Sequence, residues 1–236
     1  MSYLAIGFIC GFFIPYVVRR YLKIRLFEYS NFVSDLYWIF KLTKRVSKQK
    51  RTNNLKYKQL HNHYLMRSIG WGIFSAAIFF LISLTLPKNE APWIAFLVII
   101  LFTLSEIDKF TELLPDILTY PLLLGGFAYA AFAGLLLGEN NMLSTTNSAL
   151  GAIIGYTLPI IASLLLVWKH RNNFGGGDIK LLTALGAWFG VTVIPYIIVL
   201  SCPIFGITCL IKKQKAGPYG PSIVLSALII LFILIY

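Results

Sequence analysis

Long apolar stretches without charged side chains are the feature that most constrains the fold of this chain. A helix that spans a bilayer needs about 20 predominantly apolar residues. The stretches that lack Asp, Glu, Lys and Arg are 1–18, 68–87, 91–105, 117–138, 140–168, 181–211 and 216–236. The sequence therefore predicts an all-α, polytopic membrane protein, and it excludes a disordered chain, a disulfide scaffold and a single-anchor protein.

The composition and the first stretch agree with this prediction. Charged residues make up 13% of the chain, whereas a soluble domain carries roughly 25%. The stretch 1–18 has the length of a signal peptide, but its basic cluster, Arg19 and Arg20, follows it instead of preceding it. We interpret 1–18 as a retained first transmembrane helix.

The basic residues predict the topology. Residues 19–67 contain thirteen Lys and Arg against Glu28 and Asp35. Short loops rich in Lys and Arg stay in the cytoplasm, which predicts that 19–67 lies inside and that the N-terminus lies outside. Alternation of the later spans then predicts that segments 106–116 and 169–178 are also cytoplasmic.

The stretch 181–211 is long for one span and short for two. Gly190 and Pro195 lie near its middle, where a tight turn would fit. With two short spans, the lysines at 212–215 face the cytoplasm, as the charge rule favours. We therefore predict about eight transmembrane helices, with both termini outside.

The basic segment 19–67 also contains an amphipathic pattern. Apolar residues recur at helical spacing in this segment, and they are Leu22, Leu26, Tyr29, Val33, Leu36 and Phe40. This pattern favours an interfacial helix on anionic membrane lipids. Nothing beyond charge indicates nucleic-acid binding, so no nucleic-acid partner is predicted. Residues 47–63 are interpreted as a polar linker.

The cysteines do not predict a disulfide framework or a metal site. Cys10, Cys202 and Cys209 all lie in apolar stretches and form no CxxC pair. His61 and His63 form an HxH pair inside the predicted linker, and we interpret them as linker residues. No metal ligands are therefore predicted.

Ionisable residues at the ends of spans are candidates for function, because charge is costly at membrane depth. Five acidic residues are predicted on the cytoplasmic side outside the basic segment: Glu106, Asp108, Glu112, Asp116 and Asp178. Asp178 follows three glycines, Gly175, Gly176 and Gly177, which would let a second backbone or a substrate strand approach closely. The structural alternative for Asp178 is a helix N-cap.

Two aspartates lie in the segment before the fourth span, and they differ in their structural roles. Asp116 follows Pro115 and precedes an apolar run, so we interpret it as the N-cap of that span. Asp108 follows the predicted third span, 91–105, near a helix end where the macrodipole disfavours a carboxylate. Asp108 is therefore the stronger functional candidate of the two.

An aspartate pair on one face of a bundle indicates a particular chemistry. Two carboxylates close together cannot both ionise, so one of them keeps a proton. The ionised group can take a proton from water while the protonated group polarises a peptide carbonyl. Such a pair hydrolyses an amide without a metal or a covalent intermediate. Spacing alone does not say whether Asp108 and Asp178 meet.

The segment before the last span is rich in Pro and Gly. Pro218, Gly220 and Pro221 occur in the run Gly-Pro-Tyr-Gly-Pro at 217–221. One interpretation is a rigid turn that leads into a helix. The other is a backbone segment that lines a functional cavity.

Three motifs in this order resemble the type IV prepilin peptidases, which are intramembrane aspartic proteases of the GxGD type. The motifs are Asp108-x6-Pro115-Asp116-x2-Thr119, the run Gly175–Leu181 with Asp178 and Lys180, and Pro218–Pro221. The resemblance covers residues 1–18 and 68–236, and it implies that 68–236 is a membrane-embedded peptidase core. By position, it implies that Asp108 and Asp178 are the catalytic pair.

The resemblance also implies a substrate and a location. The family removes a short basic leader from type 4 prepilins and type II secretion pseudopilins, after a Gly, at the cytoplasmic face. The implied location is the bacterial inner membrane, and the implied partners are the pilus or type II secretion assembly machinery.

One departure from the family concerns the segment 19–67. Many bacterial members carry two CxxC pairs in this loop and also methylate the new N-terminus, whereas 19–67 contains no cysteine. The resemblance therefore implies proteolysis without a cofactor. S-adenosylmethionine would be needed only if the second, methyltransferase activity is retained.

Two alternative functions follow from the same residues. Asp108 and Asp178 could bind a proton or cation in a transporter, where broken helices and buried acids also occur. A pilus assembly factor without activity is the other alternative, and the presence of both aspartates argues against it.

Overall fold

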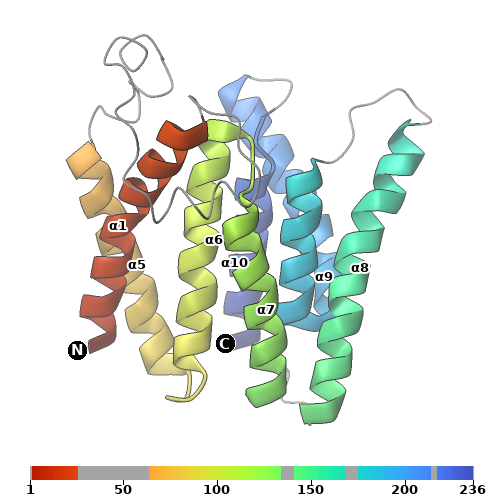
Figure 1. Ribbon diagram of the computed structural model, residues 1–236, viewed down its shortest axis with the longest axis horizontal. Helices are drawn as coiled ribbons and strands as arrows, with labels where there is room; N and C mark the ends of the chain where they lie inside the picture. Colours follow the sequence, from red (N-terminus) through yellow and green to blue (C-terminus); the bar gives the residue numbers. More distant parts are fainter. Residues whose placement is uncertain (1, 26–63, 134–140, 168–174, 214–216, 236) are drawn as a thin grey trace.

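The computed structural model describes residues 2–25, 64–133, 141–167, 175–213 and 217–235 (Figure 1), and these residues form seven helices. The helices are α1 (Ser2–Arg25), α5 (Tyr64–Thr85), α6 (Ala91–Thr111), α7 (Asp116–Phe132), α8 (Asn141–Val167), α9 (Gly176–Lys212) and α10 (Gly220–Ile235). No strand occurs within the described residues. The predicted all-α class is confirmed.

The lengths of these helices fit a protein that crosses a membrane several times. Five of the described helices, α1, α5, α6, α8 and α9, are long and apolar enough to span. The helices α7 and α10 are apolar but shorter, with 17 and 16 residues. The first helix continues to Arg25, beyond the predicted boundary at residue 18. The predicted interfacial helix, the linker 47–63 and the HxH pair lie mainly outside the described residues.

Helix α9 is broken at Gly190, where a turn was predicted. Gly190 has φ 76° and ψ 179°, a left-handed conformation that glycine adopts without strain. A straight helix of this length would be about 55 Å long. Figure 1 instead shows α9 running to the end of the bundle where the termini lie and then turning back. Pro195 lies in the helical part beyond the break.

Helix α8 supports this break in α9. The Val191 N–H donates to Asn147 Oδ1 at 2.9 Å. Val191 is the first residue after the break at Gly190. The Ser148 hydroxyl donates to the Ala187 carbonyl at 2.6 Å. Beside these contacts the two helices touch backbone to backbone, because a Cβ added to Gly186 would overlap the Gly151 carbonyl oxygen. The reversal therefore depends on small and polar residues of α8.

A methyl group at Gly186 should destabilise the fold. We expect Gly186→Ala to lower the unfolding temperature in detergent clearly, because overpacking costs about 1–3 kcal/mol and the obstacle is backbone. Gly206→Ala, also in α9, is the matched control, since nothing lies within 4 Å of its added Cβ. Equal unfolding temperatures for the two variants would contradict the close packing of α8 on α9.

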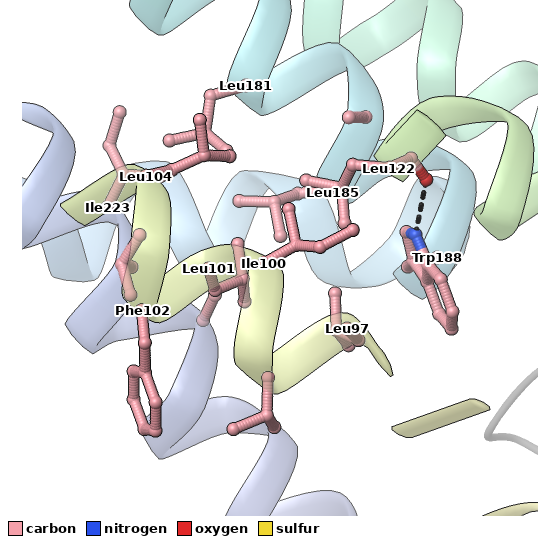
Figure 2. Packing of buried hydrophobic residues seen from close by; sticks show 14 of the residues in the cluster. Leu97, Ile100, Leu101, Phe102, Leu104, Leu122, Leu181, Leu185, Trp188 and Ile223 are labelled. Carbon is pink, nitrogen blue, oxygen red and sulfur yellow. Dashed lines mark hydrogen bonds between the residues drawn. The ribbon is translucent and has the colours of Figure 1, made fainter. Parts of the chain in front are cut away.

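Helix α6 is the central element of the core. Figure 2 shows Leu97, Leu101 and Leu104 of α6 among side chains of α7, α9 and α10. The indole N–H of Trp188 in α9 donates to the Leu122 carbonyl of α7 at 2.7 Å. Because α6 is buried from its first turn to Asp108, its last turn is held in place by packing on several sides.

Candidate active site

A cavity of about 390 Å³ opens where α6 ends and α7 and α9 begin. This end of the bundle lies opposite the two chain termini (Figure 1). The residues that line the cavity come from two of the sequence motifs, and they are Asp108, Glu112, Leu113, Leu114, Asp116, Gly175, Gly176, Gly177, Asp178 and Lys180. The fold therefore brings together two motifs that are far apart in the sequence.

Asp108 lies in the last turn of α6 and not after the helix, because α6 continues to Thr111. Its side chain is buried, with 3% of the residue exposed. The Gly220 N–H donates to Asp108 Oδ2 at 3.0 Å. A Cβ at Gly220 would lie 2.7 Å from the same oxygen, so only glycine fits without displacement.

This contact joins the third sequence motif to the site. Gly220 is the first residue of α10, and Pro221 lies in the first helical turn, where the missing N–H of proline costs little. The first interpretation of the Pro-Gly segment is therefore confirmed, whereas no residue of 217–221 is among those that line the cavity. The segment is a turn that leads into a helix, with Pro218 just before it, and its backbone also contacts Asp108.

Asp178 is the third residue of α9. The predicted alternative, that Asp178 is the N-cap, is wrong, because Gly175 occupies that position with φ −65° and ψ 140°. The Gly175 backbone also hydrogen-bonds to the Asp178 carboxylate, which resembles the returning arm of a capping box. Asp178 is partly exposed, and it lies close enough to Asp108 for the two charges to interact.

Asp116 is also not an N-cap. Pro115 takes that position with φ −72° and ψ 133°, and no side chain caps the helix. Because the extended conformation ends at Pro115, Asp116 becomes the first helical residue. Its Oδ1 accepts a hydrogen bond from Lys180 Nζ at 2.7 Å, so Asp116 joins α7 to α9 at the wall of the cavity.

Glu106 is buried and paired, which the sequence did not indicate. Its carboxylate accepts a hydrogen bond from the Arg67 guanidinium and one from Lys109 Nζ at 3.3 Å. Lys109 is one helical turn away, but no periodicity links Arg67 to Glu106. Two of the five predicted cytoplasmic acids, Glu106 and Asp116, therefore pair with cations. Asp108 and Asp178 instead hydrogen-bond to backbone groups, and the charge of Asp178 acts on Asp108.

The three glycines before Asp178 have different surroundings. A Cβ at Gly177 would lie 3.0 Å from Leu114 Cβ, and one at Gly175 would lie 3.0 Å from Asp178 Oδ2. Nothing lies within 4 Å of a Cβ at Gly176, which lines the cavity. A second backbone therefore packs at Gly177, and open space lies at Gly176.

The described residues contain no group of three or more His, Cys, Asp and Glu side chains that could hold a metal ion. The cysteines at 10, 202 and 209 are free thiols. The chemistry that the described site offers is therefore that of two carboxyl groups beside a cavity.

Comparison with known proteins shows which family this arrangement belongs to. A relative in Vibrio cholerae serotype O1, a prepilin leader peptidase/N-methyltransferase, is 31% identical over 165 residues, which are 65% of this chain and 62% of that protein. A protein of the same description in Escherichia coli K12 is 29% identical over 185 residues, which are 75% of this chain and 78% of that protein.

A third relative with this description, from Aeromonas salmonicida, is 32% identical over 173 residues, 67% of this chain and 55% of that protein. This chain therefore spans between half and two thirds of the length of the Aeromonas and Vibrio relatives. No solved structure matches it. The model of the type IV leader peptidase family matches residues 95–211, a range that includes both Asp108 and Asp178. The part of this chain that contains both aspartates, residues 95–211, belongs to the type IV leader peptidase family.

Proposed function

We propose that this protein is a membrane aspartic endopeptidase that removes the basic leader of type 4 prepilins or type II secretion pseudopilins. The observation that supports this most is the meeting of Asp108 and Asp178 at one cavity of an apolar helical bundle. The relatives are described as prepilin leader peptidases, which gives the transporter alternative no support.

The aspartate pair suits hydrolysis of a peptide bond by water. One carboxylate accepts a proton from the attacking water, and the other carboxyl donates a hydrogen bond to the peptide carbonyl. The tetrahedral intermediate then collapses, the C–N bond breaks, and a carboxyl proton goes to the leaving amine. Because the Gly220 N–H donates to Asp108 Oδ2, we assign the role toward water or substrate to the other oxygen, Oδ1.

The substrate strand would enter beside Gly176. An extended chain brings its backbone within a few ångströms of the carboxyls only where no side chain intervenes, and the space at Gly176 is open. Glu112 is exposed and lines the same cavity. Its negative charge complements a basic leader, while Asp116 is neutralised by Lys180.

Gly176→Val tests this path. We expect a loss of cleavage with normal membrane accumulation, because Gly176 lines the cavity and nothing lies within 4 Å of a Cβ added there. Gly177→Val is the comparison, and it should lower stability as well, since its Cβ meets Leu114. Full activity of Gly176→Val at matched protein levels would contradict a strand path beside this residue.

For the topology we propose eight spans, with each half of α9 crossing once and with the cavity at the cytoplasmic face. Three observations support this: the charge distribution, the break at Gly190 and the position of both termini at one end (Figure 1). The proposed units are a first span at 1–18, a basic segment at 19–67 that contacts anionic lipids, and a peptidase core at 68–236. The proposed location is the bacterial inner membrane.

Reporter fusions test this topology. A reporter fused after Lys215 should report the cytoplasm, and one fused at Tyr236 should report the outside, because α10 lies between the two positions. Phosphatase and fluorescent-protein fusions at each position give opposite signals and serve as mutual controls. A cytoplasmic signal at Tyr236 would contradict the eight spans.

The relatives are also described as N-methyltransferases, and S-adenosylmethionine is the donor such an activity needs. The cavity beside the aspartates is lined by acids, glycines, two leucines and one lysine. It therefore offers no aromatic ring to an adenine. The residues that line this cavity do not fit this donor, and we derive no methyl-transfer step for the protein.

Leader cleavage by the purified protein tests the proposed activity. The protein in detergent is incubated with a prepilin, and leader loss is followed by a gel shift and by the mass of the new N-terminus. A prepilin whose Gly before the cleavage site is replaced is the control substrate. Cleavage of the first prepilin alone supports the proposal, and an unchanged mass with both would overturn it.

A further inference from the structure

The turn that places Gly220 against Asp108 is anchored by a residue that the site does not otherwise use. Tyr219 directly precedes α10, and its carbonyl accepts hydrogen bonds from the N–H groups of Ser222, at 2.9 Å, and Ile223, at 3.2 Å. Tyr219 therefore sets the direction of the first turn of α10. The next N–H in the chain is that of Gly220, which donates to Asp108.

The side chain of Tyr219 is fixed to the second half of α9. Its hydroxyl lies 2.5 Å from Ser201 Oγ, and its ring meets the Phe205 ring edge-on at 5.1 Å and 88°. Ser201 is fully buried, and its own hydroxyl donates to the Ile198 carbonyl at 2.7 Å. Since Ser201 has one proton to donate, the Tyr219 hydroxyl is the donor in the bond between them.

We propose that Tyr219 is a positioning residue, whose hydrogen bond to Ser201 holds the Gly220 N–H on Asp108 and so orients this carboxyl toward the cavity. This inference rests on the proposed peptidase function. The first half of α9 places Asp178, and the second half, through Ser201 and Tyr219, places the donor that holds Asp108. One broken helix thereby aligns both carboxyls.

The variant Tyr219→Phe removes the hydroxyl and keeps the ring that packs on Phe205. We expect kcat for leader cleavage to fall about 3- to 10-fold, as for one lost hydrogen bond, with KM unchanged because Tyr219 is not among the residues that line the cavity. Ser201→Ala should give the same loss. The double variant should be no worse than either single variant, because all three lack the same bond.

Ser226→Ala is the matched control, since Ser226 is also fully buried and donates only within its own helix, to Ile223, at 2.8 Å. Hydrogen exchange of a peptide covering 217–225 gives a readout that does not need activity. Exchange there should become faster in Tyr219→Phe and Ser201→Ala and stay unchanged in Ser226→Ala. If the wild type does not cleave prepilin, the proposed function fails. The exchange measurement still tests whether the Tyr219–Ser201 hydrogen bond holds the first turn of α10.

Four outcomes would overturn the inference. The first is wild-type kcat for Tyr219→Phe at matched protein levels, and the second is unchanged exchange in both variants. The third is a double variant whose loss equals the product of the two single losses, because independent effects multiply. A rise in KM with normal kcat also counts against it, since that pattern belongs to a residue that binds substrate.

Discussion

Asp108→Asn should abolish leader cleavage, and Asp178→Asn should do the same. Losing a positioned acid or base typically costs about 10²–10⁴-fold in rate. The Asn amide has the same size as the carboxyl. At position 108 its oxygen still accepts a hydrogen bond from the Gly220 N–H, and at position 178 it keeps the hydrogen bond to the Gly175 backbone. The fold should therefore survive, and the loss reports on chemistry. The measurement is the cleavage rate of purified variants at matched concentrations.

The double variant, with Asn at both 108 and 178, should be little worse than either single variant. Residues that act as one unit are strongly non-additive, because removing either one disables the shared step. Losses that multiply would mean that the two carboxyls act separately. That result would contradict a dyad even if each single variant were inactive.

Asp116→Asn is the matched control for this experiment. Asp116 lines the same cavity but pairs with Lys180, and both side chains are partly exposed. Such pairs are worth about 0.2–1 kcal/mol, and an Asn oxygen still accepts a hydrogen bond from the lysine. Most of the cleavage should remain. An inactive Asp116→Asn together with an active Asp108→Asn would move the dyad to Asp116 and Asp178.

The distribution of apolar residues predicted the helical class and most helix positions, because a spanning helix needs a long uncharged stretch. The break at Gly190 was also predictable, since a glycine in the middle of a stretch too long for one span marks a turn. Helix ends were less predictable. Helix α6 extends to Thr111, and Glu106 and Asp108 are both buried in its last turns. The pattern of apolar and charged residues along the sequence does not show that burial.

The N-cap role predicted for Asp116, and the N-cap alternative for Asp178, were wrong for a related reason. An aspartate near a helix start is a good cap by itself, but the residue with the extended conformation decides where the helix begins. That residue is Pro115 in one case and Gly175 in the other. The pairing of Asp116 with Lys180 depends on how α7 meets α9, which the sequence does not encode locally.

The contact between Gly220 and Asp108 is a further feature that sequence alone did not predict. The Pro-Gly segment indicated backbone near a cavity, but it did not indicate which carboxyl the backbone would meet. In the structure the α10 N-terminus donates to Asp108 at 3.0 Å. Gly220 is therefore required because the α10 backbone lies so close to the Asp108 carboxyl. Replacing Gly220 tests whether this contact positions Asp108.

Gly220→Ala should reduce leader cleavage about 100-fold, a loss typical of a displacement of about 1 Å at a reacting group. The new Cβ would lie 2.7 Å from Asp108 Oδ2 and 3.0 Å from Cγ. Either the carboxyl turns away or α10 retreats, and both changes break the hydrogen bond. The rate is measured under single-turnover conditions, so that slow product release does not mask the change.

Gly70→Ala is the control, because nothing lies within 4 Å of a Cβ at that position, and it should cleave at the wild-type rate. The unfolding temperature separates the two ways in which Gly220→Ala could lose activity. A rotated Asp108 carboxyl leaves α10 packed, so the unfolding temperature should stay close to that of Gly70→Ala. If Gly220→Ala cleaves as fast as Gly70→Ala, then the Gly220 N–H does not orient Asp108, and Asp108 would have to be positioned by the packing of α6 alone.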